Sequence, residues 1–209
     1  YRTHEAMALA GLGEVDSLRR RLAQWEATPE PSDWAGSRTY IAALELAAHG
    51  KEREGREMLV GTLPLYGRLR KTEGYRDELY DILLETGQFD EARREVLAGL
   101  STVKSIEDSI GFLGDLGSIA ARQGKVDDAA RYDRLLAADG RRPGLAGEAA
   151  AARSILSAWL GDREGAVRFL EEARAHGVGW AEYRWVHREL AFAGLRDYPP
   201  FQQFLKPRE

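Results

Sequence analysis

Apolar residues along the chain recur at helical spacing. Through most of its length they fall three or four residues apart, which is the stripe that an amphipathic helix buries. No stretch sustains the alternation of apolar and polar positions that is typical of a half-buried strand. The pattern therefore predicts an all-α fold.

A glycine returns every 37 residues. The column consists of Gly13, Gly50, Gly87, Gly124 and Gly161. A fixed period of this kind is the signature of a repeat architecture. A tight turn between two helices needs a residue that accepts a positive φ without a Cβ clash. We therefore predict five helical hairpins, each with its turn at one of these glycines.

Two further columns keep the same period. Five residues after each glycine lie small or apolar residues, which are Leu18, Gly55, Ala92, Ala129 and Ala166. Four residues further on lie Leu22, Leu59, Val96, Asp133 and Leu170. The two columns are one turn apart on one face of the second helix of each hairpin, so both should be buried. Asp133 interrupts this pattern.

The expected organisation is one domain spanning residues 1–209. Its hairpins cover residues 1–30, 37–69, 74–101, 105–140 and 147–177, and a C-terminal cap covers 178–209. Between hairpins the helical pattern is interrupted by Pro29, Pro31, Pro64 and Pro143. Six aromatic residues are expected to cover the last apolar face, with a ligand-binding cluster as the alternative; they are Trp180, Tyr183, Trp185, Phe192, Phe201 and Phe204.

The segments Gly87-Gln-Phe-Asp-Glu-Ala92 and Gly124-Lys-Val-Asp-Asp-Ala129 resemble the tetratricopeptide repeat (TPR). The resemblance implies a right-handed α–α superhelix, or solenoid, that binds a partner protein or peptide in a concave groove and has no chemistry of its own. Two features depart from the family: the period is 37 rather than about 34, and Gly55 replaces the usual alanine.

The segment from Leu195 to Leu205 is similar to the end of repeat arrays in bacterial multidomain proteins. We therefore expect the chain to be a piece of a larger protein that also carries a kinase, cyclase or transcriptional regulator domain. This context gives an alternative function, a ligand-sensing or regulatory arm. Stacking of repeat ends into a self-assembly is a third possibility.

In the TPR family the first helix of each hairpin lines the groove, at positions 10, 6, 3 and 2 before the turn glycine. The candidate partner-binding residues are Tyr40, Leu44, Asp77, Asp81, Glu85, Ser118, Arg122, Ile155 and Trp159.

The three acidic candidates Asp77, Asp81 and Glu85 share one helix face, where like charges are mildly destabilising. Such a stripe would suit a partner with basic side chains. The alternative is a solvated face whose charge is offset by neighbours such as Arg76. The apolar candidates either receive an amphipathic partner or pack against adjacent hairpins.

Motifs for chemistry are missing from the sequence. Gly111, Gly114 and Gly117 lack the spacing of a phosphate-binding loop and are expected to let helices approach closely. The four histidines form no zinc-binding pair. We expect neither an enzyme nor a metal or cofactor site.

The composition of the chain limits the classes of partner that it is expected to bind. A net charge of −4 offers no broad basic field for nucleic acid. No apolar run approaches the roughly 18 residues needed to cross a bilayer, so no membrane insertion is expected. The absence of cysteine suits a reducing or an oxidising compartment, and we favour the cytoplasm.

Overall fold

The computed structural model describes residues 2–26, 34–69, 76–178 and 186–206. Every regular element in these ranges is a helix, and none of the described residues lies in a strand. The predicted all-α fold is therefore confirmed. No described helix is both long enough and apolar enough to span a bilayer. The chain divides into two compact units, residues 1–88 and 89–209, and each is considered by itself.

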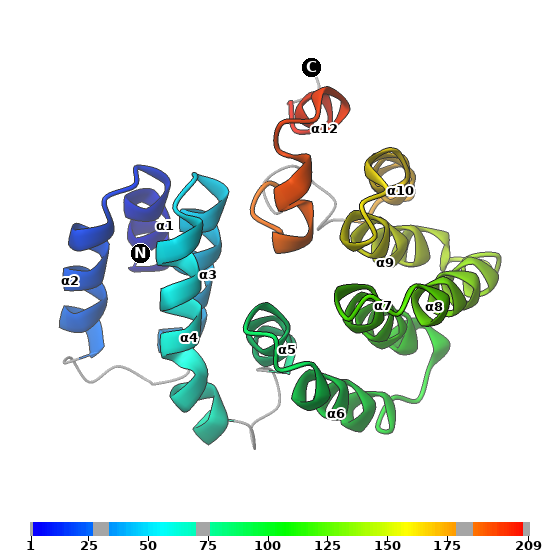
Figure 1. Ribbon diagram of the computed structural model, residues 1–209, viewed down its shortest axis with the longest axis horizontal. Helices are drawn as coiled ribbons and strands as arrows, with labels where there is room; N and C mark the ends of the chain where they lie inside the picture. Colours follow the sequence, from blue (N-terminus) through cyan, green and yellow to red (C-terminus); the bar gives the residue numbers. More distant parts are fainter. Residues whose placement is uncertain (1, 27–33, 70–75, 179–185, 207–209) are drawn as a thin grey trace. The chain divides into compact units, whose positions relative to one another are not determined.

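The described residues of the first unit form five helices. They are α1 (Arg2–Gly11), α2 (Val15–Glu26), α3 (Trp34–Ala48), α4 (Glu52–Leu69) and α5 (Arg76–Glu85). The helices α1 and α3 pack on each other, and α2 and α4 pack on the helix before each of them (Figure 1). Buried apolar residues of α1, α2 and α3, among them Ala10, Leu18 and Leu46, form the core between the first two hairpins.

The second unit follows the same plan. Its helices are α6 (Phe89–Leu100), α7 (Ile106–Arg122), α8 (Val126–Asp139), α9 (Ala146–Trp159), α10 (Arg163–Ala175), the 3-10 helix η2 (Leu190–Leu195) and α12 (Pro199–Phe204). The helices α7 and α8 form one hairpin, α9 and α10 the next, and α7 packs directly on α9 (Figure 1).

The 37-residue glycine column forms the turns. The five glycines have φ values of 72°, 80°, 77°, 72° and 79°. At Gly124, for example, the glycine N–H donates to Ala121 O (3.0 Å) and the N–H of Lys125 donates to Ala120 O (2.9 Å). The same pair of bonds recurs at the other four glycines. This is a Schellman motif, which ends a helix on a left-handed residue, so the predicted turns are confirmed.

The first apolar column is buried in both units. The side chains of Leu18, Ala92, Ala129 and Ala166 are fully buried. Gly55 occupies the same place in α4, where a Cβ atom would lie 2.6 Å from Ala43 O on α3. The departure from alanine therefore allows a closer approach of α3 and α4 than a methyl group permits.

Asp133 breaks the second column because it forms an ion pair. Arg153 of α9 donates from Nε to Asp133 Oδ1 (2.7 Å) and from a terminal nitrogen to Oδ2 (3.1 Å). The same guanidinium lies 4.1 Å from the centre of the Phe169 ring. A bidentate pair thus links α8 to α9 where the other hairpins have an apolar contact.

One prediction about helix ends is wrong. Pro64 was expected to interrupt the helical pattern, but α4 continues through it to Leu69. A proline removes one N–H donor and leaves the carbonyl four residues earlier without its helical partner. That carbonyl belongs to Val60, and both Val60 and Pro64 are exposed, so the lost hydrogen bond lies on the solvent-facing side of α4. Pro29 and Pro31 lie outside the described residues, and Pro143 lies in the loop between α8 and α9.

Candidate partner-binding surface

In the first unit the predicted groove residues lie on α3 and α5. Tyr40 is half-buried, whereas Leu44 is buried with 7% of its surface exposed. Asp81 and Glu85 are half-buried on α5. The side chain of Asp77 lies outside the described residues.

Two tyrosines bind the acidic face of α5. The Tyr40 hydroxyl donates to Asp81 Oδ2, which links α3 to α5. The Tyr66 hydroxyl donates to Glu78 Oε2, which links α4 to α5. A hydrogen bond to a carboxylate is stronger than one between neutral groups. Asp81 therefore has a structural task within its own unit.

Glu85 lies close to a basic side chain. Arg56 of α4 donates to the backbone carbonyl of Glu85 (2.8 Å), and its guanidinium is 4.0 Å from Glu85 Oε2. The neighbour expected from sequence was Arg76, whose side chain lies outside the described residues. This arrangement agrees with the alternative interpretation, in which neighbouring basic side chains of the same unit offset the negative charge of the acidic face.

In the second unit, α7 packs closely on α9, and this packing buries the groove positions Gly114 and Ser118. A Cβ atom on Gly114 would lie 2.9 Å from Ala152 Cβ, and one on Gly117 would lie 3.0 Å from Leu156. These two glycines let the helices approach, as expected, whereas Gly111 faces open space. Because the helices are so close, Ser118 retains only 1% exposure and is not accessible to a partner.

Arg122 and Trp159 meet at the C-terminal ends of α7 and α9. The guanidinium carbon of Arg122 lies 4.4 Å from the centre of the Trp159 ring, within the range of a cation–π interaction. Both side chains are half-buried. Ile155, one turn before Trp159, is also half-buried, and both residues pack partly against the apolar cluster formed with the C-terminal segment.

The position two residues before each turn glycine is half-buried in every hairpin. Its members are Gly11, Ala48, Glu85, Arg122 and Trp159. Six residues before the glycine the exposure varies: Leu44 and Ser118 are buried, whereas Met7, Asp81 and Ile155 are half-buried. Of these two columns, the one next to the turn is thus the one that is accessible in every hairpin.

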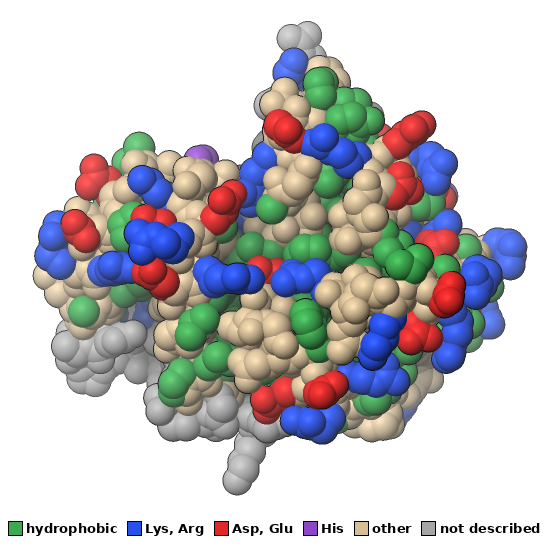
Figure 2. Space-filling view, in the orientation of Figure 1, with side chains coloured by type: hydrophobic (Ala, Val, Ile, Leu, Met, Phe, Trp, Pro, Cys, Tyr) green, Lys and Arg blue, Asp and Glu red, His purple; other side chains and the backbone are tan. Residues whose placement is uncertain are grey.

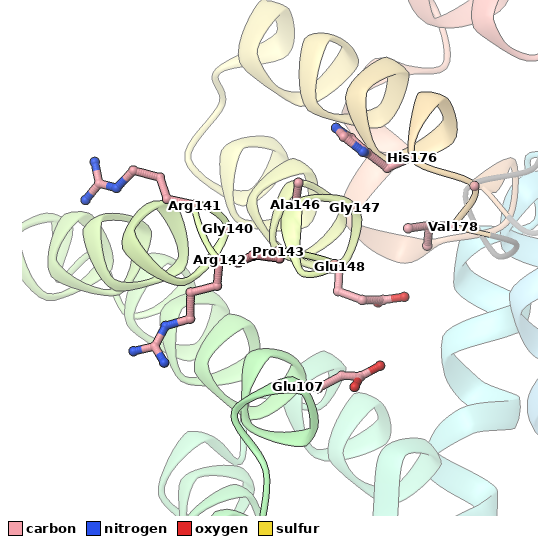
Figure 3. Close-up of a pocket in the computed structure, with 12 residues that line it drawn as sticks. Glu107, Gly140, Arg141, Arg142, Pro143, Ala146, Gly147, Glu148, His176 and Val178 are labelled. Atoms are coloured by element: carbon pink, nitrogen blue, oxygen red, sulfur yellow. The ribbon is translucent and has the colours of Figure 1, made fainter.

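A cavity of about 470 Å³ lies at the helix ends of the second unit. It is bounded by the start of α7, the loop between α8 and α9, and the loop after α10 (Figure 3). In this view the carboxylates of Glu107 and Glu148 point to one side and the guanidinium groups of Arg141 and Arg142 to the other. Pro143 predicts a helix break in this loop, but no sequence pattern predicts the cavity.

Charges of both signs are interspersed on the surface that Figure 2 shows, with apolar side chains between them. Within either unit taken separately, the described His, Asp and Glu side chains do not bring three ligand atoms together. The distinctive chemistry of the accessible column is therefore the stacked Arg122–Trp159 pair.

No protein-family model, curated protein or solved structure matches this chain.

Proposed function

We propose that the chain is a non-catalytic protein-interaction scaffold, a TPR-like array of helical hairpins that binds a partner protein or peptide along the first helices of its hairpins. Five turns with the same left-handed glycine and the same two hydrogen bonds, repeated every 37 residues, support a tandem array. Arrays of this kind present extended surfaces and characteristically bind other proteins.

The observation that carries the proposal is the Arg122–Trp159 pair. Tryptophan and arginine are enriched among the residues that dominate the energy of protein interfaces. Here they stack on each other at equivalent positions of consecutive hairpins, half-buried and held by rigid helices. A ring fixed in this way loses little side-chain freedom when a partner covers it.

The charged cavity gives weaker support to the alternative function, a ligand-sensing arm that binds a small molecule. A small-molecule site is normally a largely apolar cleft with a few convergent polar groups. Apolar side chains are a minority of this cavity's lining, and its four charged side chains point apart in Figure 3 rather than toward a common centre. The interaction scaffold is therefore the function that the geometry favours.

The test uses three purified baits with a lysate of the source organism: the wild-type chain, Arg122→Ala/Trp159→Ala, and Arg168→Ala. Arg168 is exposed on the outer helix α10, which makes it the matched control. Proteins retained by the wild type are identified by mass spectrometry. The most abundant of them is then purified and titrated calorimetrically against all three baits.

We expect the double variant to weaken binding of the purified partner by at least roughly 30-fold, since interface hot spots contribute about 2 kcal/mol or more. Circular dichroism must show that all three baits remain equally helical. Equal affinity for the wild type and the double variant would show that Arg122 and Trp159 do not contribute to the interface, and the proposed binding surface would lose its support.

A further inference from the structure

The C-terminal strap, which we define as residues 186–206, takes the place of a sixth hairpin. Its η2 helix packs on α9, and α12 packs on α10. The turn between η2 and α12 includes Tyr198, which lies 37 residues after Gly161. The strap thus continues the register of the array with helices of six residues each. Figure 1 shows both helices beside α9 and α10.

Two pairs of apolar residues anchor the strap. Phe192 and Leu195 form the first pair and Phe201 and Phe204 the second, and none of the four is more than 2% exposed. Each pair has the spacing i, i+3, which places both side chains on one face of a helical turn. They share a core with α10 residues that include Leu170. The strap is therefore bound as an amphipathic peptide would be.

Two arginines of α10 hold the strap, one at its central turn and one near its C-terminal end. Arg163 donates to Gly194 O (2.8 Å), pairs with Asp197 and lies 4.9 Å from the centre of the Tyr198 ring. Arg174 donates to Phe204 O (3.2 Å) and lies 4.0 Å from the centre of the Phe204 ring. Each guanidinium combines a backbone acceptor with an aromatic ring, so α10 recognises both the main chain and the side chains of the strap.

The strap depends on this surface for its structure. Isolated helices shorter than about 12 residues are marginal in water, because nucleation is unfavourable. The order of η2 and α12 therefore comes from docking on α9 and α10. Such an element can open without unfolding the helices beneath it.

We propose that the α9–α10 surface is a peptide-binding site that the strap occupies as a built-in ligand. The partner that it fits is an apolar segment with two Φ-x-x-Φ turns, where Φ is an aromatic or leucine residue and the second turn begins nine residues after the first. This proposal rests on the interaction function proposed above and adds to it a partner class and a competitor in the same chain.

The test measures binding of a fluorescein-labelled peptide with the sequence of residues 186–206 to the full chain. Two receptors are compared by fluorescence anisotropy, the wild type and Phe201→Ala/Phe204→Ala, in which the strap is weakened but α9 and α10 are unchanged. Because the tethered strap competes with the peptide, the weakened receptor is expected to bind the peptide at least about tenfold more tightly than the wild type. A peptide carrying the same two alanines is expected not to bind.

Adding Arg163→Met and Arg174→Met to the weakened receptor should lower its peptide affinity, because both contacts to the strap's backbone are lost. Equal peptide affinity for wild-type and weakened receptors, or no binding to either, overturns the proposal. This result is independent of the Arg122–Trp159 test, since the ligand is supplied and no lysate partner is needed.

Hydrogen exchange on the wild-type chain gives a second measurement that does not rely on the variants folding. We expect amides of residues 190–205 to exchange through an opening at least about tenfold more frequent than that of α9. If both segments exchange only by one common unfolding event, the strap is not displaceable and the proposal fails.

Discussion

Gly55 and Gly61 are two glycines of the same helix with opposite surroundings. A methyl group on Gly55 would lie 2.6 Å from the backbone oxygen of Ala43 and 3.2 Å from the backbone nitrogen of Ala47. Backbone atoms cannot move aside as a flexible side chain can, so α3 and α4 would have to separate. A methyl group on Gly61 would meet no atom within 4 Å. The repeat register places Gly55 in a column expected to be buried, but it does not show how closely the backbone of α3 approaches that position.

We predict that Gly55→Ala lowers the free energy of unfolding by about 1–3 kcal/mol, as overpacking does. Gly61→Ala should raise it by about 0.5–1 kcal/mol, because alanine restricts the unfolded chain and favours the helix. Urea unfolding followed by circular dichroism compares the two. If both substitutions stabilise, the close approach of α3 and α4 is absent.

Asp133 shows how a broken repeat position can be satisfied by a residue in another helix. The repeat pattern would place leucine or valine there, as in the other hairpins. The partner that makes aspartate suitable, Arg153, is 20 residues away on α9 and lies over the Phe169 ring. Nothing in the local pattern around Asp133 identifies that partner.

We therefore predict that Asp133→Leu, which restores the apolar column, lowers the free energy of unfolding by about 1 kcal/mol. A fully buried ion pair would lose more, but the Asp133 and Arg153 side chains are both partly exposed. Stability falls because the Arg153 guanidinium keeps its position but no longer has the Asp133 carboxylate as its partner. Arg153→Leu added to Asp133→Leu should recover most of it, since replacing both partners avoids an unpaired charge. A double-mutant cycle of thermal unfolding measures the coupling. A stabilised single variant would contradict the assigned pair.

At the scale of elements, the turn glycines decide where each hairpin reverses. Gly124 has a φ of 72° and open space where a Cβ atom would lie. The demand for glycine at this turn is therefore a matter of backbone conformation alone. Asparagine tolerates the left-handed region better than alanine does.

We expect Gly124→Ala to destabilise the second unit by about 1–2 kcal/mol and Gly124→Asn by clearly less. Gly111→Ala is the matched control, because Gly111 lies within α7 with open space around it; this change should be neutral or stabilising. Calorimetric melting temperatures rank the three variants. Equal losses for alanine and asparagine would point to a cause other than the left-handed turn.

The helices and turns were predictable because their signals are local. A left-handed glycine and two apolar columns lie within one hairpin, so a single sequence reveals them. The groove residues depend on distances between helices. Ser118 is buried because Gly114 and Gly117 allow α7 to approach α9 closely. The Tyr40–Asp81 hydrogen bond joins residues that are 41 positions apart in the sequence. Periodicity assigns a residue to a face but not the depth to which a neighbouring helix covers that face.

At the scale of the whole molecule, the 37-residue period continues across the boundary between the two compact units. That boundary falls between Gln88 and Phe89, directly after the glycine turn that ends α5. Nothing in the glycine column marks this turn as different from the other four. In repeat proteins each element interacts mainly with its neighbours, so stability is distributed along the chain rather than concentrated in one core.

This organisation predicts that a destabilising change acts within its own unit. Gly55→Ala in the first unit should accelerate amide exchange in α1 to α4 by about tenfold or more, since each 1.4 kcal/mol is a factor of ten. Exchange in α8 to α10 should change much less. Asp133→Leu in the second unit should produce the reverse pattern. Hydrogen exchange with mass spectrometry on the two variants and the wild type distinguishes this from a single cooperative fold, in which either variant would accelerate exchange in both units equally.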